Sequence, residues 1–164
     1  MAYESIYPPT PVGKVEIKTL PAARAIASKM SPQGGSMNSS FMQLFRFIQT
    51  NAIPMSTPVE ADRENRGAMR FYIGPSLTNR AFASTEAVTV LDLPERIVVS
   101  IGMRGGYTRH RFDDGVARLQ EWLKANPQWV AAGQASAVYW NSPFVPFFIK
   151  RSEVHLPVRK AETK

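Results

Sequence analysis

Charged side chains gather around one glycine turn in the second half of the sequence. Arg104 is followed by two glycines, Arg109 and Arg111 come shortly after it, and Asp113 and Asp114 follow. Guanidinium groups beside the free N–H groups of a helix start hold a carboxylate or a phosphate well. Salt bridges from the same arginines to the neighbouring carboxylates are the alternative. The sequence alone leaves both interpretations open.

The histidines are the next candidates for chemistry. The sequence has two of them and no cysteine, so disulfides, thiolate metal sites and cysteine catalysis are excluded. His155 alternates with Val154 and Leu156 in a strand pattern, so we expect it to face solvent together with Glu153. His110 lies among arginines near a helix start, where its cationic form is disfavoured. We keep it as a candidate axial metal ligand.

A strand, a turn and a helix must position these groups. Residues 96–103 alternate with period two and end at the glycine turn, which predicts a strand with one strongly apolar face. The helix pattern that follows is predicted over residues 114–125. Residues 15–19 predict another strand, with Val15, Ile17 and Thr19 on its inward face.

The same order of elements occurs twice along the chain. Leu20-Pro21 and Leu93-Pro94 each precede a strand, a pair of glycines, an apolar helix pattern, a Ser/Pro turn and a closing strand. Residues 15–73 and 88–158 therefore predict two halves related by an approximate twofold axis, with equivalent helices at 40–51 and 114–125.

Aromatic residues supply candidate pocket walls. Phe41, Phe45 and Ile48 share one face of the first predicted helix. That face belongs either to a well-buried helix or, in part, to a pocket for a flat apolar ligand. Phe144 and Phe148 lie in a proline-rich segment and would be costly to expose, so they belong to the core or to the same pocket.

Bulk properties narrow the function classes. The formal net charge is +7, but the cations are scattered rather than arranged in a run, so we expect no nucleic-acid partner. The charge serves either solubility or the attraction of a small anion. The start of the sequence does not resemble a signal peptide and no apolar run approaches about 20 residues, so we expect a cytoplasmic protein without a membrane partner.

No enzyme signature is present, since the sequence has no phosphate loop, dinucleotide fingerprint or His-Glu-x-x-His. Glu16, Glu60 and Glu153 are candidate acid–base groups, but no arrangement of partners singles one of them out.

Four segments in register resemble the SOUL haem-binding protein family over roughly residues 12–158. The first, Pro54-Met55-Ser56-Thr57-Pro58-Val59, is similar to the family's Met-Thr-x-Pro-Val segment. The others are residues 71–75, the strand into residues 105–107, and residues 139–144 followed by 152–154.

This resemblance implies an α+β fold of duplicated strand–helix–strand halves, with two main helices on a distorted antiparallel barrel or sheet in a single domain, residues 1–164. It also implies binding of haem or another tetrapyrrole. Some members carry a histidine as the proposed axial ligand where this chain has Thr19. Because a hydroxyl is a poor haem ligand, we expect any haem binding here to be independent of histidine.

We therefore expect a carrier or buffer, without turnover, for haem or a related apolar anionic small molecule held in an apolar cleft. The half-repeat design also resembles gyrase-inhibitor-like effector domains, so a hydrolase-like enzyme and an effector-binding regulatory module remain alternatives. The expected ligand-binding residues are Thr19, Phe41, Phe45, Ile48, Met55, Met103, Arg104, Phe144 and Phe148.

Overall fold

The chain divides into two compact units. The computed structural model describes residues 4–28, 37–53, 56–62, 68–74, 77, 80–85, 88–105, 108–140 and 150–162. Unit 1 consists of residues 1–7 and 21–95, and unit 2 consists of residues 8–20 and 96–164. Within the described ranges, no helix is both long and apolar enough to cross a membrane.

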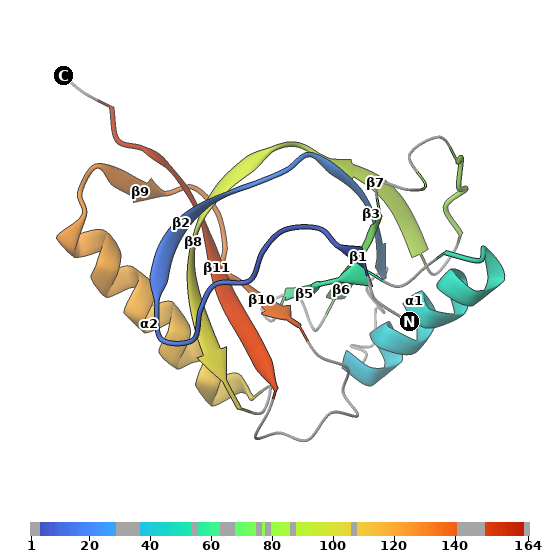
Figure 1. Ribbon diagram of the computed structural model, residues 1–164, viewed down its shortest axis with the longest axis horizontal. Coiled ribbons are helices and arrows are strands. Elements are labelled where there is room, and N and C mark those ends of the chain that lie inside the picture. The colour runs from blue at the N-terminus through green and yellow to red at the C-terminus, as the bar shows by residue number, and fades with distance from the viewer. Residues whose placement is uncertain are drawn as a thin grey trace. The chain divides into compact units, whose positions relative to one another are not determined.

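Unit 1 combines one helix with an antiparallel sheet (Figure 1). The strand order in this unit is β5-β6-β3-β7. The strands β1 and β4 form a separate short parallel pair. The helix α1 packs on β6 and β3 through Leu44, Phe47 and Ile48, which are buried. The elements are β1 (Glu4–Ser5), β3 (Ala23–Ser28), α1 (Met37–Thr50), β4 (Ser56–Thr57), β5 (Val59–Asp62), β6 (Ala68–Ile73) and β7 (Val88–Leu93).

The strands of unit 2 are antiparallel and follow the order β2-β8-β11-β10, with β9 pairing onto the end of β11. The helix α2 packs on β11 and β8. Gly115 makes this approach close, because a Cβ there would lie 2.6 Å from a methyl of Val154. The elements are β2 (Val15–Leu20), β8 (Arg96–Arg104), α2 (Arg109–Ala125), β9 (Trp129–Ala131), β10 (Ser136–Tyr139) and β11 (Arg151–Lys160).

The helix α2 begins at Arg109, five residues before the predicted start at 114. Thr108 is the cap, since its side chain accepts a hydrogen bond from the backbone N of Arg111 at 3.1 Å. Asp113 therefore lies inside the helix, where it pairs with Arg109.

Both units have the same connectivity. A strand (β3 or β8) leads into the helix, and a hairpin follows whose second strand (β6 or β11) pairs with the first strand. An additional antiparallel strand pairs on the other side of β3 or β8. The α+β class with two helices and antiparallel sheets is thus confirmed, whereas the twofold axis stays a prediction.

The repeated windows do not coincide with the compact units. The strand β2 opens the first window but pairs with β8 in unit 2, and β7 opens the second window but pairs with β3 in unit 1. The chain changes unit between residues 7 and 8 and again beside the two Leu-Pro pairs, between 20 and 21 and between 95 and 96. Periodicity finds strands but carries no information on which neighbour each strand selects.

A backbone segment lies directly on β8 at Gly102. The N–H of Gly13 donates to the carbonyl of Gly102 at 2.9 Å, and the N–H of Gly102 donates to Lys14 at 3.2 Å. A Cβ on Gly102 would overlap the carbonyl oxygens of Thr10 and Pro11. The absence of a side chain is therefore what allows this segment to reach the sheet.

We expect Gly102→Ala to lower the free energy of unfolding by about 2–3 kcal/mol, because the added methyl group meets rigid backbone. Urea denaturation measures the change. In the control Gly133→Ala, the new Cβ would lie 3.1 Å from the Pro157 ring, which can shift, so we expect a loss below about 1 kcal/mol. Similar small losses in both variants would show that the segment does not lie on β8.

Candidate functional site

The Glu153 carboxylate is the centre of a buried polar cluster in unit 2. The residue is 1% exposed. Its Oε1 accepts hydrogen bonds from Lys18 Nζ at 2.8 Å and from Ser100 Oγ at 2.9 Å. Its Oε2 accepts from the backbone N of Thr10 at 2.8 Å and from Trp140 Nε1 at 2.5 Å. Both oxygens are thus surrounded by donors.

His155 completes this cluster, with its Nε2 2.7 Å from Oε1 of Glu153. Burial is the largest single influence on Glu153 and raises its pKa, but the hydrogen bonds and charges of His155 and Lys18 outweigh it and hold the pKa at about 2. The carboxylate is therefore ionised at neutral pH, and Nε2 of His155 acts as the donor.

The predicted exposure of Glu153 and His155 is wrong, since His155 is only 2% exposed. The strand β11 lies between β8 and β10, and α2 covers the face that carries Val154. The opposite face is closed by Lys18, Thr10 and Ser100. A polar row can be buried when its members satisfy one another, and alternation of polarity does not reveal this.

The strand β2 is oriented opposite to the prediction. Thr19 is exposed, whereas Lys18 and Leu20 are buried, so the row of Val15, Ile17 and Thr19 is not the inward one. The long Lys18 side chain faces inward because its ammonium group pairs with Glu153. The position that we expected to line the ligand site therefore points away from the buried face of its strand.

Unit 1 has its own buried carboxylate, Glu60, which is 2% exposed. Its Oε1 accepts from the hydroxyls of Tyr7 at 3.0 Å and Tyr72 at 2.5 Å. Its Oε2 accepts from Arg70 through both Nε and Nη2. Burial lowers the pKa of Arg70 most, but Glu60 and the two tyrosines raise it further than burial lowers it.

These contacts bear on the candidate acid–base groups. Glu153 is ionised and fully engaged by donors, and Glu60 is paired with a guanidinium group. Glu16 is half-buried and accepts a hydrogen bond from Thr10 Oγ1 at 2.9 Å. A general acid must hold a proton near the working pH, which Glu153 does not.

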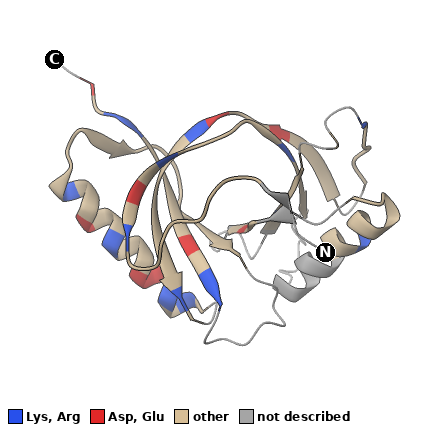
Figure 2. Ribbon diagram, viewed as in Figure 1, with Lys and Arg blue, Asp and Glu red and all other residues tan. Residues whose placement is uncertain are grey.

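The arginines near the glycine turn take different roles. Arg109 forms the salt bridge to Asp113, at 3.1 Å. Arg111 instead donates from Nη1 to the carbonyl of Arg104 at 2.8 Å. Arg104 itself is exposed and is the direct cross-strand neighbour of Arg151. In the ribbon of Figure 2, blue marks Lys and Arg positions at the start of α2 and at the start of β11.

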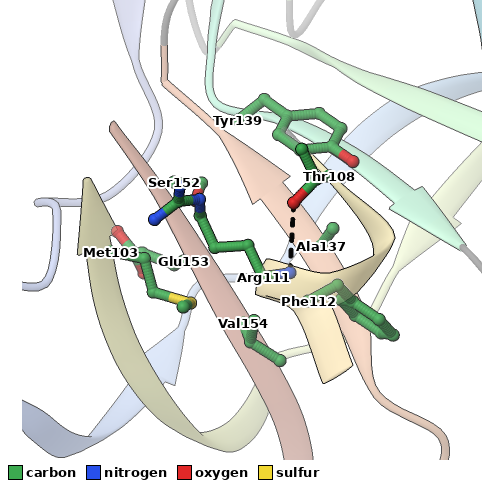
Figure 3. Close-up of a pocket in the computed structure, with 9 residues that line it drawn as sticks. All are labelled: Met103, Thr108, Arg111, Phe112, Ala137, Tyr139, Ser152, Glu153 and Val154. Carbon is green, nitrogen blue, oxygen red and sulfur yellow. Dashed lines mark hydrogen bonds between the residues drawn. The ribbon is translucent and has the colours of Figure 1, made fainter. Parts of the chain in front are cut away.

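A small pocket, here called the α2 pocket, lies between the first turn of α2 and the sheet of unit 2 (Figure 3). Its walls combine apolar side chains with hydroxyl groups, one guanidinium group and the carboxylate of Glu153. The lining residues are Met103, Thr108, Arg111, Phe112, Ala137, Tyr139, Ser152, Glu153 and Val154.

The predicted ligand residues are distributed over both units. Met103 lines the α2 pocket and Arg104 follows it. Phe45 is half-buried and Ile48 is buried, both on α1 of unit 1. Met55, Phe144, Phe148 and the Phe41 side chain lie outside the described residues. The nine positions therefore remain a predicted site.

Sequence reasoning missed Lys18, Ser152 and the structural role of Thr10. The available signal was a polar row, Glu153 and His155, on a strand with apolar neighbours on both sides. Among the residues described, no group of three or more His, Asp or Glu side chains could hold a metal ion. His110 is exposed on the first turn of α2.

Comparison with known proteins gives a family and a fold. The family model for the SOUL heme-binding protein matches residues 2–157. No curated protein matches significantly.

Several solved structures share the fold. The EcmrR C-terminal domain superposes with a TM-score of 0.62 at 16% identity, covering 90% of this chain and 98% of that one. A hydrolase from Listeria innocua gives 0.61 at 13% identity, covering 92% and 94%. SAV2435 bound to tetraphenylphosphonium gives 0.51 at 8% identity, covering 89% and 94%.

We expect the stability of the protein to depend on Glu153 at acid pH. Its folded pKa of about 2 lies below the usual 4.5, so its stabilisation is complete above pH 4.5 and is lost as the pH falls towards 2. This difference between the folded and the usual pKa corresponds to a contribution on the order of 3 kcal/mol to the free energy of unfolding at neutral pH.

The measurement is the unfolding free energy of the wild type and Glu153→Gln between pH 2 and 7. We expect the gap between the two proteins to narrow as the pH falls through this window. The control is Glu121→Gln, whose carboxylate is exposed and pairs with Lys124 on the same helix. A gap that stays constant with pH would contradict the assignment of the low pKa to Glu153.

Proposed function

The chain belongs to the SOUL heme-binding protein family, and on this premise we propose that it reversibly binds haem or a related apolar anionic tetrapyrrole, as a carrier or buffer without turnover. The observation that carries the proposal is the family match, which spans residues 2–157 of the 164-residue chain. The fold alone carries less weight, because similar folds occur in hydrolase and regulator structures.

The residues present suit the macrocycle better than they suit a strong iron ligand. In unit 2, Met103 is half-buried beside the exposed Arg104, so an apolar and a cationic group are available for a carboxylated ring. Haem would supply a flat apolar surface and two carboxylates. At about 25 cal/mol per Å², burial of a few hundred Å² supports micromolar binding without a strong metal bond.

Neither histidine is well placed to act as the iron ligand. The Nε2 of His155 is engaged with Glu153 inside the protein. His110 is exposed on α2, and Thr19 offers only a hydroxyl. In this proposal, the affinity for the ring therefore comes from burial of its faces and from charge.

A Soret absorption titration with haemin tests the proposed function. We expect a shifted band that saturates at micromolar haemin. The absence of a shift at tens of micromolar protein would overturn the proposal and favour an effector-binding or hydrolase-like role for the chain.

We expect Arg104→Ala to weaken binding of a carboxylated tetrapyrrole by about 1–3 kcal/mol, because the contact is charge-assisted. The esterified ligand should bind the variant and the wild type alike. Lys124→Ala removes the same charge from an exposed site on α2 and is the control. Equal losses for acid and ester would assign Arg104 a role in folding instead.

We expect haemin affinity to be independent of histidine. His110→Ala and His155→Gln should each bind within about threefold of the wild type, a difference below about 0.7 kcal/mol. Glutamine retains a donor for Glu153, and circular dichroism checks that the variants are folded. A loss of about tenfold or more in a folded variant would identify that histidine as the ligand.

A further inference from the structure

The α2 pocket contains a hydroxyl group that has no hydrogen-bond partner among the described residues. Ser152 is 8% exposed, and strand alternation puts its side chain on the same face of β11 as Val154, which contacts Gly115 of α2. Ser152 therefore points into the α2 pocket, which it lines. Within the described part of the chain, its Oγ makes no hydrogen bond. Leaving a buried hydroxyl unpaired costs about 1–3 kcal/mol, so this position favours a ligand atom.

A guanidinium group lines the same pocket. Arg111 is half-buried, and in Figure 3 its side chain extends from the first turn of α2 across β11. Its Nη1 donates a hydrogen bond to the carbonyl of Arg104. Its Cζ packs against Gly105 so closely that a Cβ on Gly105 would lie only 2.6 Å from it. The absence of a side chain at Gly105 therefore gives the guanidinium its place. These contacts fix the planar group before any ligand arrives.

The surrounding charges and walls define the chemistry of a ligand. The N-terminus of α2 adds positive potential, and Arg104 and Arg151 are cross-strand neighbours at the same end of the sheet. The Glu153 carboxylate also lines the pocket, and its charge is compensated by Lys18 and by the hydrogen bond to His155. The walls formed by Met103, Phe112 and Val154 are apolar. A planar carboxylate on an apolar body fits this combination better than a phosphate dianion, which requires more donors.

We propose that the α2 pocket binds one carboxylate group of an apolar organic acid, with Arg111 and Ser152 as its donors. This inference goes beyond the proposed function, because it concerns any apolar carboxylate and not haem alone. If a tetrapyrrole is the ligand, the site would take one of its carboxylates.

Benzoate and its neutral counterpart benzyl alcohol test the site on the full chain. We expect benzoate to shift the backbone NMR signals of Arg111, Phe112 and Ser152 and to saturate at millimolar concentration. Benzyl alcohol should bind at least about tenfold more weakly, because it lacks the charge. Equal binding of the two would overturn the carboxylate assignment, as would inorganic phosphate that displaces benzoate at equal concentration.

Three variants locate the donors. Arg111→Gln should weaken benzoate binding by about tenfold or more, and Ser152→Ala by about threefold to tenfold. Arg109→Gln removes the same charge from the same helix turn, but its side chain is 58% exposed and faces Asp113, so affinity should stay within about twofold. Equal losses for Arg109→Gln and Arg111→Gln would show a general positive field and overturn the proposal.

Ser152→Ala keeps the test decisive if Arg111→Gln fails to fold, because it removes a single oxygen atom. Unchanged benzoate affinity in folded Ser152→Ala would overturn the proposed role of the hydroxyl. Benzoate binding without any haemin binding would leave this site standing while the tetrapyrrole proposal fails, so the two failures are distinguishable.

Discussion

Unit 2 depends on keeping one buried carboxylate charged. Glu153 lies inside the sheet, where an isolated ion would be expensive, and it is tolerated because donors from four separate parts of the unit converge on it. Lys18 comes from β2, Ser100 from β8, Trp140 follows β10, and Thr10 belongs to the segment that crosses Gly102. The register of β2, β8 and β11 is therefore coupled to the same charge.

Unit 1 also buries a carboxylate, but different side chains satisfy it. Glu60 is paired with Arg70 across the β5–β6 hairpin, and two tyrosine hydroxyls satisfy its other oxygen. The ring of Tyr7 meets that of Tyr72 edge-on, with centroids 6.1 Å apart, so the phenols are held by packing as well as by hydrogen bonds. Removing one partner of a buried ion pair leaves an uncompensated charge. This lowers the stability of a protein far more than replacing the whole pair by apolar side chains does.

Local sequence patterns predicted where the helices and strands lie better than they predicted which side chains are buried. The periodicity of residues 96–103 and 114–125 located β8 and most of α2, because one face of each is strongly apolar. It failed for Thr19 and His155, because it assumes that a polar row faces water. The buried partners of His155 come from distant parts of the chain, so no window of sequence contains them. The α2 pocket was missed for the same reason, since Ser152 and Arg111 meet only in the folded unit.

The distribution of charge limits the kind of ligand that the chain can favour. The buried carboxylates Glu60 and Glu153 are each compensated by a cation of the same unit, Arg70 and Lys18, so neither presents net negative charge to an incoming group. The exposed carboxylates of α2 also pair with cations of that helix, Asp113 and Asp114 with arginines and Glu121 with Lys124. Basic residues remain at the end of β8 and the start of β11, within a chain of net charge +7. That balance favours an anion over a cation, which agrees with an acidic ligand more readily than with a lipophilic cation.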